Sequence, residues 1–84
     1  MQRPHSIDPC VFLEVIHLAG CDLGPAGETM RSVYNPEEPG YWIVVYMGEV
    51  MHTRTIEAHL RNLNISEERF LKWFDHYANR DIPQ

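Results

Sequence analysis

The chain has 84 residues, of which 44% are hydrophobic and 23% are charged. This composition is typical of a folded globular protein, and the length leaves no room for a second core, so we expect a single domain over residues 1–84. No apolar run approaches the roughly 20 residues of a membrane span, and the first residues lack the apolar segment of a secretory leader. These features predict a soluble cytoplasmic protein that does not bind membranes and whose two cysteines are thiols.

The charges are unevenly distributed along the chain. Twelve acidic residues outnumber seven Lys and Arg, and the whole excess lies in residues 1–50, while residues 51–84 are balanced. A protein that gained its affinity by neutralising phosphates would carry a basic face, and none is evident here. The charge pattern therefore favours a solvated acidic surface over direct DNA binding.

The spacing of apolar residues predicts an amphipathic helix over residues 8–19. Asp8 is expected to be the N-cap and Pro9 the first helical residue, where its missing N–H has no cost. The apolar residues recur at the i, i+3, i+4, i+7 spacing of a buried helical face. They are Phe12, Val15, Ile16 and Ala19.

The central segment predicts a short antiparallel sheet between about residues 30 and 52. Residues 20–28 are rich in glycine and are expected to form a loop, and residues 35–40 hold two prolines and a glycine in a strong turn signal. Residues 41–47 are almost wholly aromatic or β-branched, which favours a strand buried on both faces. Its partner is either 30–34 or 49–52. The alternative is a buried helix begun by Asn35.

The last third predicts two helices, the first capped by Thr53 or Thr55 and the second capped by Ser66. Residues 59–73 resemble a helix-turn-helix: Asn64 falls where that motif has glycine, and Ile65 is the buried turn residue. The predicted fold class is therefore α+β, with an N-terminal helix, the short sheet and a C-terminal helix-turn-helix-like pair. An all-α bundle is the alternative.

The resemblance implies DNA binding as a dimer, with Arg69 and Lys72 as the cations of the second helix. However, the start of that helix presents Glu67 and Glu68, where base-reading side chains belong. A dimeric DNA-binding transcriptional regulator is therefore the alternative function and not the first one.

Residues of metal-ligand type occur at i, i+4, i+7 and i+11 in the first helix: Cys10, Glu14, His17 and Cys21. A helix of that length spans about 16 Å, so the two cysteines cannot share one ion unless the helix ends early. We expect no metal site. Glycine-rich phosphate loops and nucleophile-elbow motifs are also missing, so the prediction is a protein with no catalytic residues and no cofactor.

Eight aromatic residues outside the first helix are many for one small core, which suggests that some form a binding surface. We expect Trp42 and Trp73 to contact a partner together with the acidic Glu37 and Glu38. The predicted function is a non-catalytic module that regulates or inhibits another protein, as adaptors, antitoxins and phage-encoded inhibitors do. A basic patch that otherwise holds nucleic acid is one surface it could cover. The sequence specifies neither the partner nor the oligomeric state.

Overall fold

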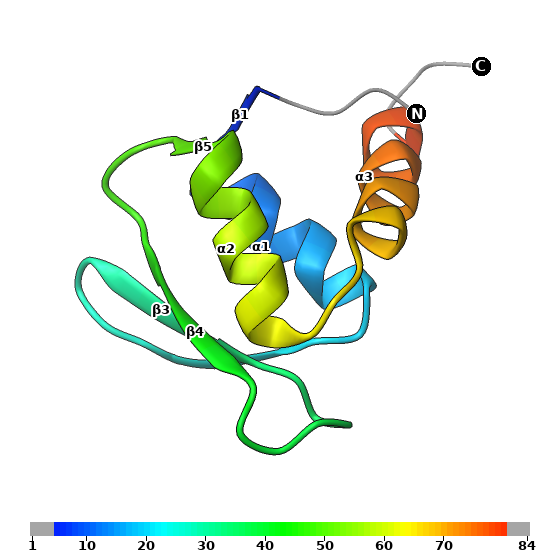
Figure 1. The fold of residues 1–84 in the computed structure, drawn as a ribbon. Helices are drawn as coiled ribbons and strands as arrows, with labels where there is room; N and C mark the ends of the chain where they lie inside the picture. The colour runs from blue at the N-terminus through cyan, green and yellow to red at the C-terminus, as the bar shows by residue number, and fades with distance from the viewer. Residues whose placement is uncertain (1–4, 81–84) are drawn as a thin grey trace.

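The computed structural model describes residues 5–80 and has an α+β fold, as predicted (Figure 1). Three helices accompany two antiparallel sheets, one with strand order β2-β3-β4 and the other formed by β1 and β5. The elements in chain order are β1 (Ser6–Ile7), α1 (Pro9–Leu18), β2 (Asp22–Ala26), β3 (Met30–Tyr34), β4 (Trp42–Tyr46), β5 (Met51–His52), α2 (Thr53–Leu63) and α3 (Glu67–Arg80).

Strand β2 corrects the prediction that residues 20–28 form a loop. Asp22 pairs with Tyr34 and Leu23 with Val33, and the register then shifts before Ala26. The glycine and proline in this segment oppose strand formation locally, but both are tolerated at a bulge in an outer strand. Pairing with β3 therefore creates a strand that the local sequence does not favour.

Strand β4 confirms the prediction that residues 41–47 form a strand and that 30–34 is its partner. The register runs from Tyr34 opposite Trp42 to Met30 opposite Tyr46. The prediction that this strand is buried on both faces is wrong. Ile43 and Val45 are buried, whereas the residues between and beside them are exposed, because the helices lie on one side of the hairpin only (Figure 1).

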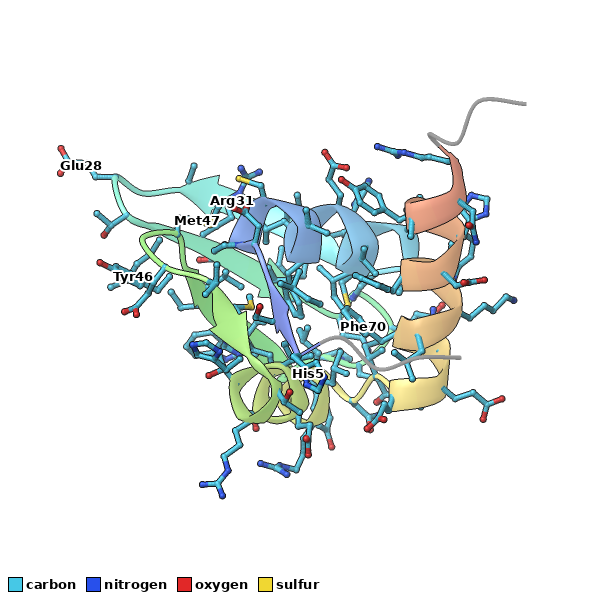
Figure 2. All side chains as sticks on the ribbon, turned by 90° about the horizontal axis from the view of Figure 1, so that it is seen from above. His5, Glu28, Arg31, Tyr46, Met47 and Phe70 are labelled. Carbon is cyan, nitrogen blue, oxygen red and sulfur yellow. The ribbon has the colours of Figure 1, made fainter. Side chains whose placement is uncertain are left out.

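Helix α1 supplies the centre of the core, as its apolar spacing predicted. Asp8 is its N-cap and accepts a 2.8 Å hydrogen bond from the backbone N–H of Cys10. Phe12 is fully buried, and its ring centroid lies 5.6 Å from that of Phe70 on α3. Figure 2 shows Phe70 pointing into the space between α3 and the other helices. The two rings therefore join the first and last helices of the fold.

The ends of the C-terminal helices follow the sequence signals in part. Asn64 has a φ of 56° and is the C-cap of α2, as expected for the residue in the glycine position. The Ser66 hydroxyl accepts a 3.1 Å hydrogen bond from the Arg69 N–H, which confirms it as the cap of α3. The prediction that Thr53 or Thr55 caps α2 is wrong. The helix follows β5 directly, and the Thr53 hydroxyl donates to the His5 carbonyl at 3.2 Å instead.

A buried asparagine joins the β3–β4 hairpin to α2. The side-chain amide of Asn35 donates a 2.9 Å hydrogen bond to the carbonyl of Leu63, in the last turn of α2. Its side-chain oxygen accepts a 3.0 Å hydrogen bond from the N–H of Glu37 within the turn. One side chain therefore holds both the turn conformation and the position of the hairpin relative to α2.

Candidate protein-interaction surface

The side of the β3–β4 hairpin that faces away from the helices is the candidate site, and we call it the open face. Side chains alternate between the two sides of a strand, so every second residue of each strand lies on this face. Cross-strand neighbours are Tyr34 with Trp42, Ser32 with Val44, and Met30 with Tyr46. The open face thus consists of Met30, Ser32, Tyr34, Trp42, Val44 and Tyr46.

The open face gathers exposed apolar side chains to a degree found nowhere else in the described residues. Trp42 is 62% exposed, although a tryptophan is the residue with most to gain from burial. All seven large hydrophobic residues that are exposed within residues 5–80 fall between positions 30 and 50. They are the five apolar members of the open face, together with Tyr41 and Val50 at its borders.

Carboxylates surround the open face at both ends. Glu37 and Glu38 lie in the turn next to Trp42, where the Tyr41 N–H donates a 3.1 Å hydrogen bond to the Glu38 carbonyl. At the opposite end, Figure 2 shows Glu28 at the outer tip of the turn between β2 and β3, beyond Tyr46, and Glu49 follows in the loop after β4. All four of these glutamates are exposed.

The cation within the hairpin does not offset these carboxylates on the open face. Arg31 pairs with Val45, a buried residue, and therefore extends from the opposite side of β3. Its Nε donates a 2.8 Å hydrogen bond to the Gly24 carbonyl of β2. The open face is consequently apolar at its centre and acidic at its ends.

The structure brings together three of the four residues predicted to bind a partner. Trp42, Glu37 and Glu38 share one end of the hairpin, but Trp73 does not belong with them. Trp73 is half-buried on α3, where its ring meets His76 edge-on at 5.4 Å, and Figure 1 shows α1 and α2 between α3 and the hairpin. Val44 and Met30 also belong to the open face, although they were not among the residues predicted to bind a partner. Every residue of 41–47 except the last is aromatic or β-branched, so no alternation marked which side is exposed.

A groove lies alongside β4 and is bounded on its other side by α2. This open hollow measures about 380 Å³. The ring of Tyr46 lies over Gly48, where a Cβ atom would clash with it, so the glycine allows the ring to form one end of the groove. The lining comes from β4, the following loop and α2: Val44, Tyr46, Glu49, Val50, Met51, His52, Thr55 and His59.

The cations proposed for DNA binding lie on α3, away from the open face. The Arg69 guanidinium lies close to Gly20. A Cβ atom on residue 20 would be only 2.6 Å from Nη2 of Arg69. The Lys72 ammonium lies 5.7 Å from the centre of the Trp73 ring. Both residues border a shallow hollow that also includes Glu68. The DNA-binding alternative stays a prediction.

The cysteines differ in their surroundings. Cys10 is exposed on α1, whereas Cys21 is buried just after the helix ends at Leu18. Desolvation raises the pKa of the Cys21 thiol to about 11, opposed by Arg69 and assisted by Asp22.

Within residues 5–80, no three His, Cys, Asp or Glu side chains are placed to hold a metal ion. Within the same range, no helix is long and apolar enough to cross a membrane.

Comparison of the chain with models of protein families, with curated proteins and with solved structures found no match.

His59, one of the two histidines that line the groove, predicts a loss of stability in mild acid. His59 is half-buried, with its ring 5.8 Å from that of Phe12, and burial lowers its pKa below the ordinary 6.5. Above pH 6.5 the imidazole is neutral in both the folded and the unfolded chain. Below it, the unfolded chain takes up the proton first, so the free energy of unfolding should fall by at most about 1.4 kcal/mol per pH unit.

Urea denaturation of the wild type and of His59→Gln between pH 5.5 and 7.5 checks this expectation. His59→Gln should show a flatter pH dependence, whereas Asn62→Ala, at an exposed position that does not titrate, should retain the wild-type slope. An unchanged slope in His59→Gln would assign the acid sensitivity to other groups.

Proposed function

We propose that this chain is a non-catalytic protein-binding module that contacts its partner through the open face. The observation that carries the proposal is the gathering of every large exposed hydrophobic side chain of the described residues between positions 30 and 50. Contiguous apolar surface rimmed by polar groups is typical of protein-interaction sites, and tryptophan and tyrosine are the residues most enriched among their energetic centres. Trp42 is therefore the proposed centre of the contact.

The charge around the open face supports a basic partner surface. The exposed carboxylates of Glu28, Glu37, Glu38 and Glu49 attract cations and repel other acidic surfaces. A module of this kind regulates or inhibits its partner by covering the surface it binds. A basic patch that otherwise holds nucleic acid is one such surface. The free thiols Cys10 and Cys21 fit a reducing compartment, so the proposal places the protein in the cytoplasm.

The test compares what the tagged wild type and Trp42→Ser retain from a lysate of the source cells, with and without nuclease. Trp42 is exposed and outside the core, so the variant should fold normally. Trp42→Ser should retain at least tenfold less of any protein that the wild type retains both with and without nuclease. A tenfold loss corresponds to about 1.4 kcal/mol of binding free energy. Asn62→Ala, at an exposed position on α2, is the matched control and should retain the same protein.

Two results would contradict the proposal. Equal retention of the same protein by Trp42→Ser and the wild type would exclude the open face as the contact. Recovery of DNA, with all proteins lost after nuclease, would instead favour the helix-turn-helix alternative. In that case Arg69→Ala and Lys72→Ala should weaken binding, and the affinity should fall steeply with salt.

A further inference from the structure

The three-stranded sheet has two outer strands, and only one of them is protected against pairing with another chain. β2 contains Pro25 and the register shift between Leu23 and Ala26, and both features hinder the addition of a strand. β4 is the other outer strand. Its five residues, Trp42–Tyr46, include no proline, glycine or charged residue. The edge of β4 therefore lacks the usual features that prevent strand addition.

The backbone groups of β4 that point away from β3 belong to Trp42, Val44 and Tyr46. The Met47 N–H donates to the Thr29 carbonyl at 2.8 Å, and bonded pairs recur at every second residue of an antiparallel ladder. The alternate residues Ile43 and Val45 thus bond to β3, and the other three face outward. No backbone hydrogen bond joins these three to another part of the chain that the structure describes.

The groove between β4 and α2 provides room for the side chains of an added strand. Val44 and Tyr46 form its strand side, and Thr55 and His59 form its helix side. Every second side chain of a strand points to the same side, so a segment paired with β4 would place alternate residues in the groove. Its remaining side chains would extend the open face.

Building on the proposed function, we infer that the edge of β4 binds an extended segment of the partner as a fourth strand of the sheet. The segment has apolar residues at its centre and lysine or arginine near both of its ends. Its backbone pairs with Trp42, Val44 and Tyr46, and its apolar side chains contact the open face and the groove. Its cations meet Glu37 and Glu38 at one end of β4 and Glu49 at the other.

A second copy of this chain fits the same edge less well. In an antiparallel pairing of two β4 strands centred on Val44, the end of one strand that Glu37 and Glu38 precede would lie beside the end of the other strand that Glu49 follows. Like charges that face each other across strands are destabilising, and each chain carries a net charge of −5. The charges therefore favour a basic segment of another protein.

The decisive variant removes a single backbone donor and keeps every side chain. The full 84-residue chain is assembled by chemical ligation at the Gly20–Cys21 junction, with an N-methyl group on the backbone nitrogen of Val44. This nitrogen faces outward, so its methylation spares the β3–β4 ladder. The unmethylated chain assembled by the same ligation is the matched control, because it retains the N–H and every side chain. Circular dichroism and the melting temperature establish that both chains fold.

The probe is a library of random twelve-residue peptides displayed on phage and selected on the wild-type chain. We expect the enriched peptides to have an apolar centre flanked by basic residues. Their Kd should rise at least tenfold on the N-methyl chain and stay within threefold of the wild-type value on the unmethylated ligated chain. Methylating the peptide's own backbone at alternate residues should have the same effect on the wild-type chain, which tests strand pairing even if the N-methyl chain does not fold.

The remaining outcomes overturn the inference, and they separate it from the proposed function. Peptides that bind the wild type and the N-methyl chain equally but lose affinity for Trp42→Ser would leave the open face as a binding site without strand pairing. Peptides insensitive to both changes would contradict both proposals. Failure to enrich any peptide overturns strand addition alone. A wild-type dimer in sedimentation equilibrium that the N-methyl group abolishes would assign the edge to a second copy.

Discussion

Phe70→Ala is expected to lower the free energy of unfolding by about 3–5 kcal/mol, which is the usual cost of truncating a buried phenylalanine to alanine. Phe70 is only 1% exposed and contacts Phe12 on α1, with ring centroids 5.6 Å apart, and Phe74 on its own helix, at 6.2 Å. Removing the ring leaves a cavity between the first and last helices. Since small proteins are stable by about 5–15 kcal/mol, the loss takes a large part of the total.

Urea denaturation followed by far-ultraviolet circular dichroism measures this loss. Phe70→Leu retains most of the buried volume and should recover more than half of the difference. Trp42→Ala, at a 62% exposed position, is the matched control for removing an aromatic ring and should stay within about 0.5 kcal/mol of the wild type. Equal losses in Phe70→Ala and Trp42→Ala would contradict the described core.

Asn35→Ala should lower the free energy of unfolding by about 2–3 kcal/mol. The substitution removes the hydrogen bond to the Leu63 carbonyl and the one accepted from Glu37, at a residue that is 7% exposed. Leaving a buried polar group without its partner costs about 1–3 kcal/mol, more than the net value of the bond itself. Because Asn35 joins the hairpin to α2, hydrogen exchange should increase in β3, β4 and the last turn of α2.

Asn35→Asp tests the same interaction through charge. At neutral pH a carboxylate would replace the donor next to a carbonyl at the C-terminal end of a helix, where the helix dipole disfavours anions. We expect a larger loss than in Asn35→Ala at pH 7 and a smaller difference between the two at pH 4, because burial raises the pKa of a carboxyl at this position and favours its protonated form there. Asn62→Ala, exposed on α2, serves as the control and should change stability by less than about 0.5 kcal/mol. Equal stability of Asn35→Ala and the wild type would contradict the bridging role.

The features that the sequence predicted correctly depend on residues near one another in the chain. Asp8 followed by Pro9 begins α1, and Ser66 caps α3. Asn64 adopts a positive φ at the end of α2. Each of these signals acts within one helical turn, where backbone geometry and a single side-chain hydrogen bond decide the outcome. The α+β class followed because the aromatic and β-branched run at 41–47 is clearly distinct from the helical spacing around it.

The features that the sequence did not reveal depend on what lies across space. Residues 22–26 become β2 only because β3 offers hydrogen-bond partners, which outweighs the poor strand propensity of Gly24 and Pro25. Both sides of β4 are apolar, so the sequence alone could not determine that helices cover only the side of Ile43 and Val45.

The same division applies to the candidate site. The sequence by itself determined that the acidic charge and many of the aromatic residues belong to the first half and the central segment, and it identified Trp42, Glu37 and Glu38. Only the tertiary structure separated Trp73 from them and added Val44 and Met30 to the open face, with β4 at the unprotected edge. The physical reason is that the conformational preferences of neighbouring residues decide which helices and strands form. Which side and which edge of the sheet remain exposed depends instead on where the helices and the other strands pack against it.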